Sequence, residues 1–316
     1  MQEPIEMLCH VGLIHHMAFP EIGKDEATVL PTLTRIARDD FFTAVEVTRI
    51  KSEELRKQAR VVLDSSGMEV IFAGQPPLLG GKLSLNHEDP AERKKAIDAC
   101  RVSVDQAYQL GAAMLVVLSG PDPGEAKRAA GRELLVDSLN QVCAYAQEKA
   151  EDYCLAVTLE NFDRTIDKKS LIGPTKEAAE VAAAVTQQYS NFGLTIDLSH
   201  QPLLSEHITE MIIDATDYLI HAHMGNCVMR DPQHPAYGDV HPRFGIPGGE
   251  NGVDELRQFL EDLYYNGFFR RSVPTRKPVI SFEIKPLAGE DSELVIANAK
   301  RTLREAWTPK EAWQAQ

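Results

Sequence analysis

The sequence has no long hydrophobic run and no excess of basic residues. Its longest apolar stretches, such as residues 114–118, are far shorter than the roughly 20 residues that span a bilayer. The formal net charge is −14, and the densest basic cluster, between Arg270 and Lys277, is brief and interrupted by proline. Because nucleic-acid binding depends on basic contacts to phosphates, we expect neither a membrane nor a nucleic acid as a partner.

Cysteine is also scarce, and its spacing does not indicate disulfides or a structural zinc site. The five cysteines are widely separated, and no Cys-x-x-Cys pair occurs. This usage is typical of reduced thiols in a cytoplasmic protein. The first residues carry no basic segment followed by an apolar stretch, so no secretory signal is expected. We therefore predict a cytoplasmic location.

The sequence does contain a regular alternation of short apolar segments with amphipathic ones. The predicted strands are residues 5–13, 44–50, 68–73, 113–119, 155–160, 192–197, 218–223 and 278–283. The predicted helices are residues 52–66, 89–110, 125–149, 175–188, 254–265 and 291–307. Alternation of this kind favours parallel βαβ units. Eight units without a change in composition predict an α/β fold, a single (β/α)8 TIM barrel that occupies residues 1–316 as one domain.

Four consecutive predicted strands end in or near a side chain that binds metals. These side chains are Glu160, Asp197, His223 and Glu283. In a parallel barrel, the carboxyl ends of all strands open at the same mouth, so the four can converge on one cation. Three carboxylates and one imidazole suit Mn²⁺, Mg²⁺ or Co²⁺ better than a structural zinc. Each residue alone has an ordinary explanation as a cap or ion-pair partner, but the four together predict a metal site.

Several residues near these ligands are candidates for other roles. His200 lies just beyond the sixth strand, where it can contact a ligand held by the metal. Lys285 lies two residues past the last ligand and is expected on the same face, holding a substrate hydroxyl or an ordinary ion pair. His221 precedes the seventh-strand ligand by two residues and is expected to orient a carboxylate deeper in the barrel. Glu46 in the second strand is interpreted as structural.

The loop between residues 225 and 252 is long for a connection in a compact domain, and such loops are usually functional. It contains Arg230, His234, His241 and Arg243. We expect at least one of these residues, with Arg230 and His241 as the named candidates, to contact the substrate or a partner protein. Around the first strand, one of His10, His15 and His16 is a further candidate for lining the pocket.

The order of these motifs resembles that of the xylose isomerase-like barrels: a strand-end Glu, then Asp-x-x-His, then His, then Glu. The resemblance extends over nearly the whole chain, although its specific motifs lie after residue 155. This group includes sugar isomerases and epimerases, hydroxypyruvate isomerases and tagatose- and psicose-type 3-epimerases. The resemblance implies a metal-dependent sugar isomerase or epimerase of carbohydrate metabolism, with one ion: Mn²⁺ by preference, and Mg²⁺, Co²⁺ or Zn²⁺ as alternatives.

The resemblance also implies roles for individual residues. The implied metal ligands are Glu160, Asp197, His223 and Glu283. In the epimerase branch, glutamates at positions like Glu160 and Glu283 also transfer the proton, and His200 contacts the substrate; these three are the expected catalytic residues. An Arg is expected shortly after the seventh-strand His, and Arg230 lies near that position at a spacing one residue longer. The implied reaction is proton abstraction next to a carbonyl, through an enediolate.

Two other enzyme classes stay open. One branch, the metal-bearing subunit of C-glycoside deglycosidases, is a lyase that cleaves 3-keto C-glycosides by β-elimination, and the expanded loop with its shifted Arg230 favours this alternative. An apurinic endonuclease-like nuclease shares the barrel but needs more ligands at the earlier strands and a basic DNA face, which the charge of −14 opposes. The expected partner is a small sugar or keto-glycoside. The expected assembly is a homo-oligomer, or a hetero-oligomer with a small β subunit if the chain is a lyase.

Overall fold

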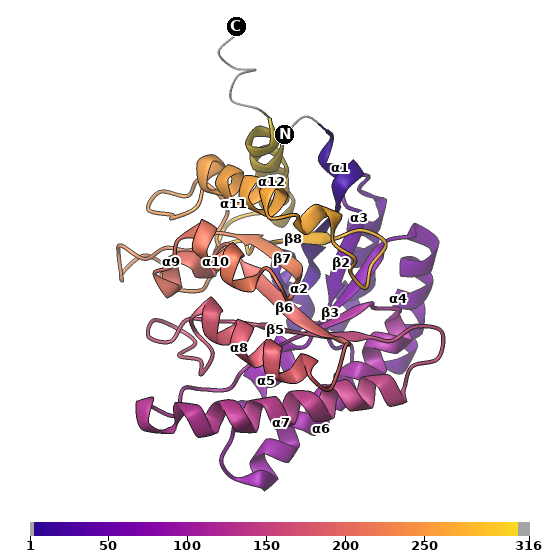
Figure 1. Cartoon of the computed structure of the whole chain (residues 1–316). Helices are drawn as coiled ribbons and strands as arrows, with labels where there is room; N and C mark the ends of the chain where they lie inside the picture. The colour runs from indigo at the N-terminus through magenta and orange to yellow at the C-terminus, as the bar shows by residue number, and fades with distance from the viewer. Residues whose placement is uncertain (1–2, 309–316) are drawn as a thin grey trace, which may run out of the picture.

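The computed structural model describes residues 3–308, and its centre is a closed barrel of parallel strands (Figure 1). Neighbouring strands pair in chain order, and β8 pairs with β1 to close the barrel. The strands are β1 (His10–Ile14), β2 (Ala44–Val47), β3 (Glu69–Ala73), β4 (Met114–Leu118), β5 (Ala156–Glu160), β6 (Phe192–Asp197), β7 (Leu219–Gly225) and β8 (Val279–Glu283). The predicted (β/α)8 TIM barrel is confirmed. The predicted domain also includes residues 1–2 and 309–316, which lie outside the described residues.

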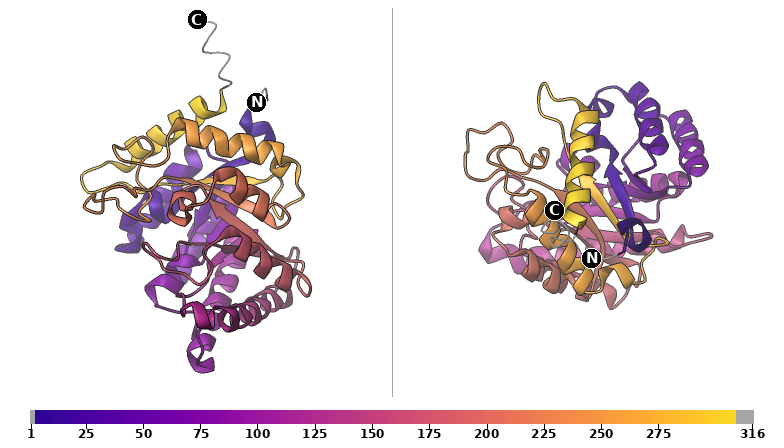
Figure 2. Two further views of the ribbon diagram at one scale, coloured as in Figure 1. Left: turned by 60° about the vertical axis from the view of Figure 1, so that its left-hand side comes forward. Right: turned by 90° about the horizontal axis from the view of Figure 1, so that it is seen from above.

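Helices surround the barrel in all three views (Figures 1 and 2). The α-helices are α1 (Ile5–Leu8), α2 (His15–Ala18), α3 (Val29–Arg38), α4 (Glu53–Ser66), α5 (Gln75–Gly80), α6 (Pro90–Leu110), α7 (Arg128–Glu148), α8 (Thr175–Thr186), α9 (His200–Leu204), α10 (Ile208–Ala215), α11 (Val253–Tyr265) and α12 (Ser292–Trp307). Short 3-10 turns are η1 (Pro20–Gly23), η2 (Glu26–Thr28), η3 (Glu125–Lys127) and η4 (Phe268–Arg270). Within residues 3–308, no helix is both long and apolar enough to cross a membrane.

The helix boundaries follow the predicted capping signals. The Ser52 side chain accepts a hydrogen bond from the backbone N–H of Leu55, and α4 ends at Gly67, whose φ of 66° is unfavourable for other residues. The Asp89 side chain caps α6, which begins with Pro90. These local signals therefore fix where two of the outer helices begin and end.

Several boundaries differ from the predictions. The first strand begins at His10, because Ile5–Leu8 forms a short helix, in which Glu, Met and Leu are good helix formers. The second strand ends at Val47, three residues before its predicted end. The last strand ends at Glu283, as predicted, but Lys285, which was expected to continue this strand, lies beyond its end.

The barrel interior changes from apolar to charged along the strands. Near the strand starts, a buried apolar layer is formed by Ala44, Ile71, Met114, Ala156 and Val279. Because side chains two apart on a strand share a face, Ala156 of β5 is followed inside the barrel by Thr158 and then Glu160. All three side chains are buried. The charged side chains therefore occupy the last inward-facing positions, at the carboxyl ends of the strands.

Candidate metal centre

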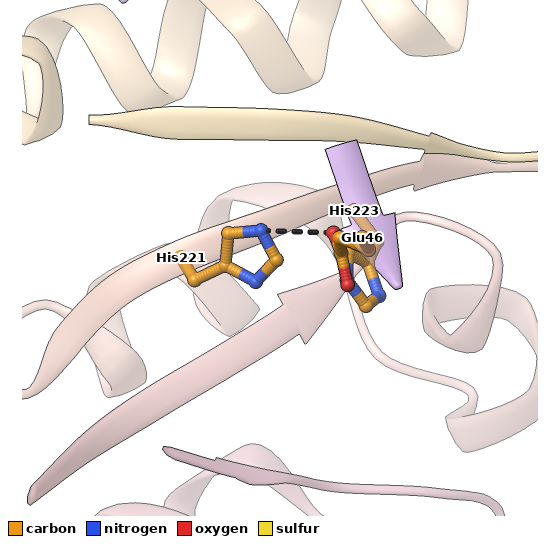
Figure 3. A group of neighbouring side chains, drawn as sticks. All are labelled: Glu46, His221 and His223. Carbon is orange, nitrogen blue, oxygen red and sulfur yellow. Dashed lines mark hydrogen bonds and ion pairs between the residues drawn. The ribbon is translucent and has the colours of Figure 1, made fainter. Parts of the chain in front are cut away.

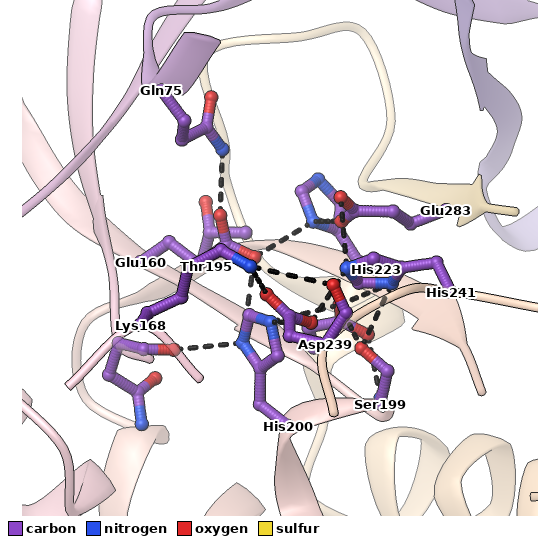
Figure 4. A network of polar contacts seen from close by, with 12 residues as sticks. Gln75, Glu160, Lys168, Thr195, Ser199, His200, His223, Asp239, His241 and Glu283 are labelled. Atoms are coloured by element: carbon purple, nitrogen blue, oxygen red, sulfur yellow. Dashed lines mark hydrogen bonds and ion pairs between the residues drawn. The ribbon is translucent and has the colours of Figure 1, made fainter. Parts of the chain in front are cut away.

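The four predicted strand-end ligands meet at the mouth of the barrel, and Figure 4 shows three of them, Glu160, His223 and Glu283. Each of Glu160, Asp197, His223 and Glu283 offers one donor atom, and these atoms all lie within 4.8 Å of one another. The Nδ1 atom of His223 lies 3.1 Å from Oε1 of Glu160 and 2.9 Å from Oε2 of Glu283. Donors that each lie about 2.1 Å from a shared cation are roughly 3 Å apart. The spacing therefore fits a divalent cation.

One oxygen in this group has no hydrogen-bond partner. Oε2 of Glu283 is buried and makes no hydrogen bond with any of the described residues, although His223 Nδ1 is 2.9 Å away. An imidazole nitrogen and a carboxylate oxygen at this distance are spaced as two ligand atoms of a common ion would be. Together with the oxygen-rich chemistry of the set, this shows that the residues fit a metal.

Glu46 contacts both His221 and His223 in the barrel interior (Figure 3). Its Oε1 atom is 3.1 Å from Nε2 of His223 and 3.1 Å from Nε2 of His221, and all three side chains are fully buried. A carboxylate on one ring nitrogen directs the other nitrogen toward a metal, so Glu46 directs Nδ1 of His223 toward Glu160 and Glu283. Glu46 was expected to be only structural, but the structure places it in the charged cluster.

The residue Gln75, at the start of α5, holds the remaining oxygen of Glu160. Its side-chain nitrogen donates a hydrogen bond of 2.7 Å to Oε2 of Glu160, while Oε1 of Glu160 faces His223. Sequence reasoning did not identify Gln75, because an amide after a strand has no distinguishing pattern. Glu160 is therefore fixed through both of its oxygens.

The long loop after β7 brings Asp239 and His241 into the same mouth. Nε2 of His241 lies 2.8 Å from Oδ1 of Asp239, and Nε2 of His200 lies 3.2 Å from the same oxygen. The second oxygen of Asp239 pairs with Nζ of Lys168 at 2.9 Å. Asp239 was not identified from the sequence, because it lies in an irregular loop where no pattern predicts which side chains face the mouth.

The backbone of this loop is held against the barrel. His241 has a φ of 57°, an uncommon left-handed conformation, and its carbonyl accepts a 2.7 Å hydrogen bond from the N–H of Lys285. A Cβ atom on Gly225 would lie 3.0 Å from the Glu283 carbonyl oxygen and 3.1 Å from Nδ1 of His241. The glycine therefore permits the loop to pack tightly on the mouth.

The carboxylates change the protonation of the neighbouring histidines. Burial alone disfavours a charged imidazole, but Asp239, Asp197 and Glu160 outweigh it and raise the pKa of His200 to about 10. In the same way, Glu283 and Asp239 outweigh burial and raise the pKa of His241 to about 9. Metal ions displace protons from such ligands. Protons and a divalent cation are thus alternative ways to balance the same buried negative charge.

A second group of possible donors adjoins the first and shares Asp197 with it. The donor atoms of Asp197, His200 and His241 lie within 4.8 Å of one another. Nδ1 of His200 is 2.9 Å from the Asn161 carbonyl, to which it donates, so Nε2 faces Asp197 and Asp239. His200, predicted to contact substrate, is 1% exposed and lies within the charged cluster instead of on the cavity wall.

A cavity of about 240 Å³ opens above this cluster and is termed the mouth cavity. Its polar lining consists of Gln75, Lys168, Asp239, His241, Glu283 and Lys285, with His16 at its edge. The predicted substrate-binding residues His241 and Lys285 are therefore on its wall. Arg230 is not: its side chain is 80% exposed and pairs with Glu250 at 3.1 Å.

Comparisons with solved structures find the same barrel in several proteins. A D-tagatose 3-epimerase-like protein is 18% identical, with a TM-score of 0.69, and the match covers 94% of this chain and 98% of the other. A 3-keto-D-glucoside 4-epimerase from E. coli is 14% identical, with a TM-score of 0.65 and coverage of 94% and 99%. The IOLI protein, whose structure holds a zinc atom, is 14% identical, with a TM-score of 0.68 and coverage of 94% and 97%.

These identities establish likeness of fold alone. A search of curated proteins finds no match. The model of one protein family, described as the xylose isomerase-like TIM barrel, matches residues 35–299, which is most of the chain. This chain therefore belongs to the xylose isomerase-like TIM barrel family.

Proposed function

We propose that this protein is a divalent-metal-dependent sugar isomerase or epimerase. The observation that carries the proposal is the approach of two carboxylates, Glu160 from β5 and Glu283 from β8, to the same ring nitrogen of His223. Moving a proton from one carbon position to another needs two acid–base groups near one substrate atom. Membership of the family, and structural neighbours that are sugar epimerases, support the sugar as substrate class.

We assign the ion to the four strand-end residues, with Mn²⁺ preferred because three of the four donors are carboxylates. When bound, such a cation polarises a carbonyl and an adjacent hydroxyl and makes the neighbouring C–H more acidic. The carboxylates of Glu160, Asp197 and Glu283 and the imidazole of His223 hold it. The Glu46 carboxylate keeps the imidazole oriented.

Side chains of the protein transfer the proton and bind the sugar. Glu283 lines the mouth cavity, so its carboxylate can take a proton from a substrate carbon or return one. Glu160 is 1% exposed, and the hydrogen bond from Gln75 to Oε2 keeps its carboxylate in place as the second proton carrier. Lys285 and His241, on the cavity wall, are the proposed contacts for sugar hydroxyls.

Solvent deuterium exchange tests this assignment. The protein loaded with Mn²⁺ is incubated in D₂O with a panel of ketohexoses and 3-keto-glucosides, and exchange and product are followed by NMR. Glu160→Gln and Glu283→Gln should each lower the exchange rate by about 10³-fold, because each removes an acid–base group. The control Glu148→Gln, at an exposed position on α7, should leave the rate unchanged.

The products separate the reactions that begin with the same proton removal. An epimer or a shifted carbonyl, with deuterium at the reacting carbon, supports the proposal. Release of the aglycone from a 3-keto-glycoside without an epimer would assign β-elimination and the lyase alternative instead. Full exchange in both glutamine variants would contradict the proton-transfer roles of Glu160 and Glu283.

A further inference from the structure

A second cavity adjoins the mouth cavity on the side of β1 and β2. It has a volume of about 280 Å³ and lies among α2, η1, α3 and the loop after β2. Its apolar walls are formed by Ile22, Val29, Leu33, Val47 and Ile50. We call this space the apolar chamber.

The apolar chamber and the mouth cavity share part of their walls. His16, Met17, Pro76 and Lys285 line both. Glu283, the proposed proton carrier, lines the mouth cavity with Lys285. A molecule whose reacting carbon lies at Glu283 can therefore extend past Lys285 and His16 into the apolar chamber.

Of the polar residues that line the apolar chamber, Glu26, Thr48 and His15 have hydrogen-bond partners within the protein, whereas the side chains of Arg49 and Lys285 have none among the described residues. The Glu26 carboxylate accepts hydrogen bonds from the backbone N–H groups of Lys51 and Ser52. The Thr48 hydroxyl donates to the Ala73 carbonyl at 2.9 Å. These groups do not need a ligand, so the surface they leave for a ligand is predominantly apolar.

His15 and His16 differ in this respect. Nε2 of His15 is 2.7 Å from the Thr32 hydroxyl and is therefore satisfied. Nδ1 of His16 is buried and has no hydrogen-bond partner among the described residues. His16 stands where the two cavities meet, so it offers one polar contact at the junction between a polar and an apolar part of a ligand.

We propose that the apolar chamber holds an aryl or alkyl group attached to the sugar, so that the substrate is a glycoside or similar conjugate and not a free monosaccharide. The inference rests on the proposed function for the location of the sugar, and it adds the class of substrate. A hydrophilic sugar ring in the apolar chamber would lose more hydrogen bonds to water than His16, Arg49 and Lys285 could replace. An apolar substituent gains from the same burial.

The size of the chamber agrees with a ring system. An apolar protein cavity of about 150 Å³ is large enough to bind benzene, and the apolar chamber is nearly twice that size. Burial of one phenyl ring tightens binding by roughly ten- to a hundredfold. A phenyl glycoside should therefore bind at least tenfold more tightly than the methyl glycoside of the same sugar.

Calorimetric titration of the full-length, Mn²⁺-loaded protein tests the proposal with two sets of probes. The first is 2-naphthol alone, which should bind at one saturable site. The second is the pair of phenyl and methyl β-D-glucosides. Gly23→Trp introduces a large side chain at the chamber wall, where a Cβ meets no atom within 4 Å and φ is not positive. Gly80→Trp is the matched control at an equally open glycine that lines neither cavity.

We expect Gly23→Trp to weaken 2-naphthol at least tenfold and to remove the preference for the phenyl glucoside, while Gly80→Trp keeps both. Absence of saturable 2-naphthol binding, equal binding of the two glucosides, or equal effects of the two Trp variants would each overturn the proposal. Deuterium exchange without any aryl preference would refute only the chamber assignment. Aryl binding without exchange on any substrate would refute only the proposed function.

Discussion

The two ends of the barrel interior are built on the same strands but differ in chemistry. On β2, Ala44 is packed in the apolar layer and Glu46, two residues later, contacts two histidines. On β8, Val279 lies in the apolar layer and Glu283 lies at the mouth. Within its five residues, β8 thus contributes both to the apolar layer at the strand starts, here called the bottom, and to the charged mouth, here called the top.

The two ends therefore have different roles: the apolar layer stabilises the fold, and the charged mouth holds the groups proposed for catalysis. Burying apolar side chains at the bottom stabilises the fold, whereas burying several carboxylates at the top is costly unless cations or protons compensate them. The top must therefore be held in place by the rest of the barrel. Substitutions at the bottom should lower stability and leave the site intact, and substitutions at the top should do the reverse.

The largest expected effect is the loss of activity and ion in Asp197→Asn. Asp197 is 1% exposed and belongs to two of the three groups of possible metal ligands among the described residues; the third group is Glu46, His221 and His223. Removing its charge should lower kcat/KM by about 10³-fold, which corresponds to about 4 kcal/mol, and should release the bound Mn²⁺. Elemental analysis and exchange rates provide the measurement. The melting temperature in EDTA should not fall, since one buried negative charge is removed; retention of a full equivalent of ion would refute the role of Asp197.

The converse substitution, Ile71→Ala, should affect stability alone. Ile71 is fully buried in the apolar layer and lies beside Glu46 in the β2–β3 register. Truncating it should cost about 2–5 kcal/mol of unfolding free energy by denaturant titration. Val61→Ala, at a residue that is 64% exposed on α4, should change stability by less than about 0.5 kcal/mol. A large loss of ion affinity in folded Ile71→Ala would show that the two ends are coupled.

Glu46→Gln tests a residue that lies between the apolar layer and the proposed metal ligands. Glu46 is the carboxylate through which the barrel interior orients His223. Loss of its charge should weaken Mn²⁺ binding by about 10- to 100-fold, as expected for a carboxylate behind a metal-binding imidazole. Calorimetric titration with Mn²⁺ measures the change. Ser281→Ala is the control, at a buried residue of β8 that lies opposite His223 of β7, and it should bind Mn²⁺ as the unmodified protein does. Similar losses in both variants would argue for a general packing effect.

The strand-end part of the site was predictable from sequence because parallel strands place their carboxyl ends at one mouth. Glu160, Asp197 and Glu283 each end a strand, and His223 lies near the end of β7. Once the strands are assigned, the topology alone brings these four side chains together. Their role as metal ligands stays a prediction, which the experiments above test.

The remaining residues of the site depend on information that strand patterns do not contain. Asp239 reaches the mouth through an irregular loop, and no periodicity predicts which loop side chain turns inward. Gln75 does so from the start of a six-residue helix that follows β3 directly. Glu46 was undervalued because a lone carboxylate within a strand does not reveal whether its neighbours across the barrel are apolar or imidazoles. Similarly, Ile5–Leu8 forms a single helical turn, which is too short to show a helical pattern that would separate it from the strand that follows.

The smallest expected effect concerns His15. This residue follows β1 at the mouth end of the barrel, as His200 follows β6, but its side chain contacts Thr32 and no carboxylate among the described residues. Burial, with a smaller contribution from His16, lowers the pKa of His15 to about 3, below its unfolded value of 6.5. The unfolded chain therefore binds a proton more readily than the folded one. The stability that neutral His15 contributes is complete above pH 6.5 and is lost progressively as the pH falls toward 3.

At pH 5.5 this loss amounts to about 1.4 kcal/mol relative to pH 7.5 and above. His15→Gln has no titrating group, so its unfolding free energy should fall less between pH 7.5 and 5.5 than that of the unmodified protein, by about this amount. Denaturant titrations in EDTA at the two pH values provide the measurement, with His207→Gln at an exposed position as the control. Identical pH dependence in His15→Gln and the unmodified protein would mean that His15 is solvated in solution. In that case, burial alone would not account for the difference between His15, whose pKa is lowered, and His200, whose pKa the neighbouring carboxylates raise.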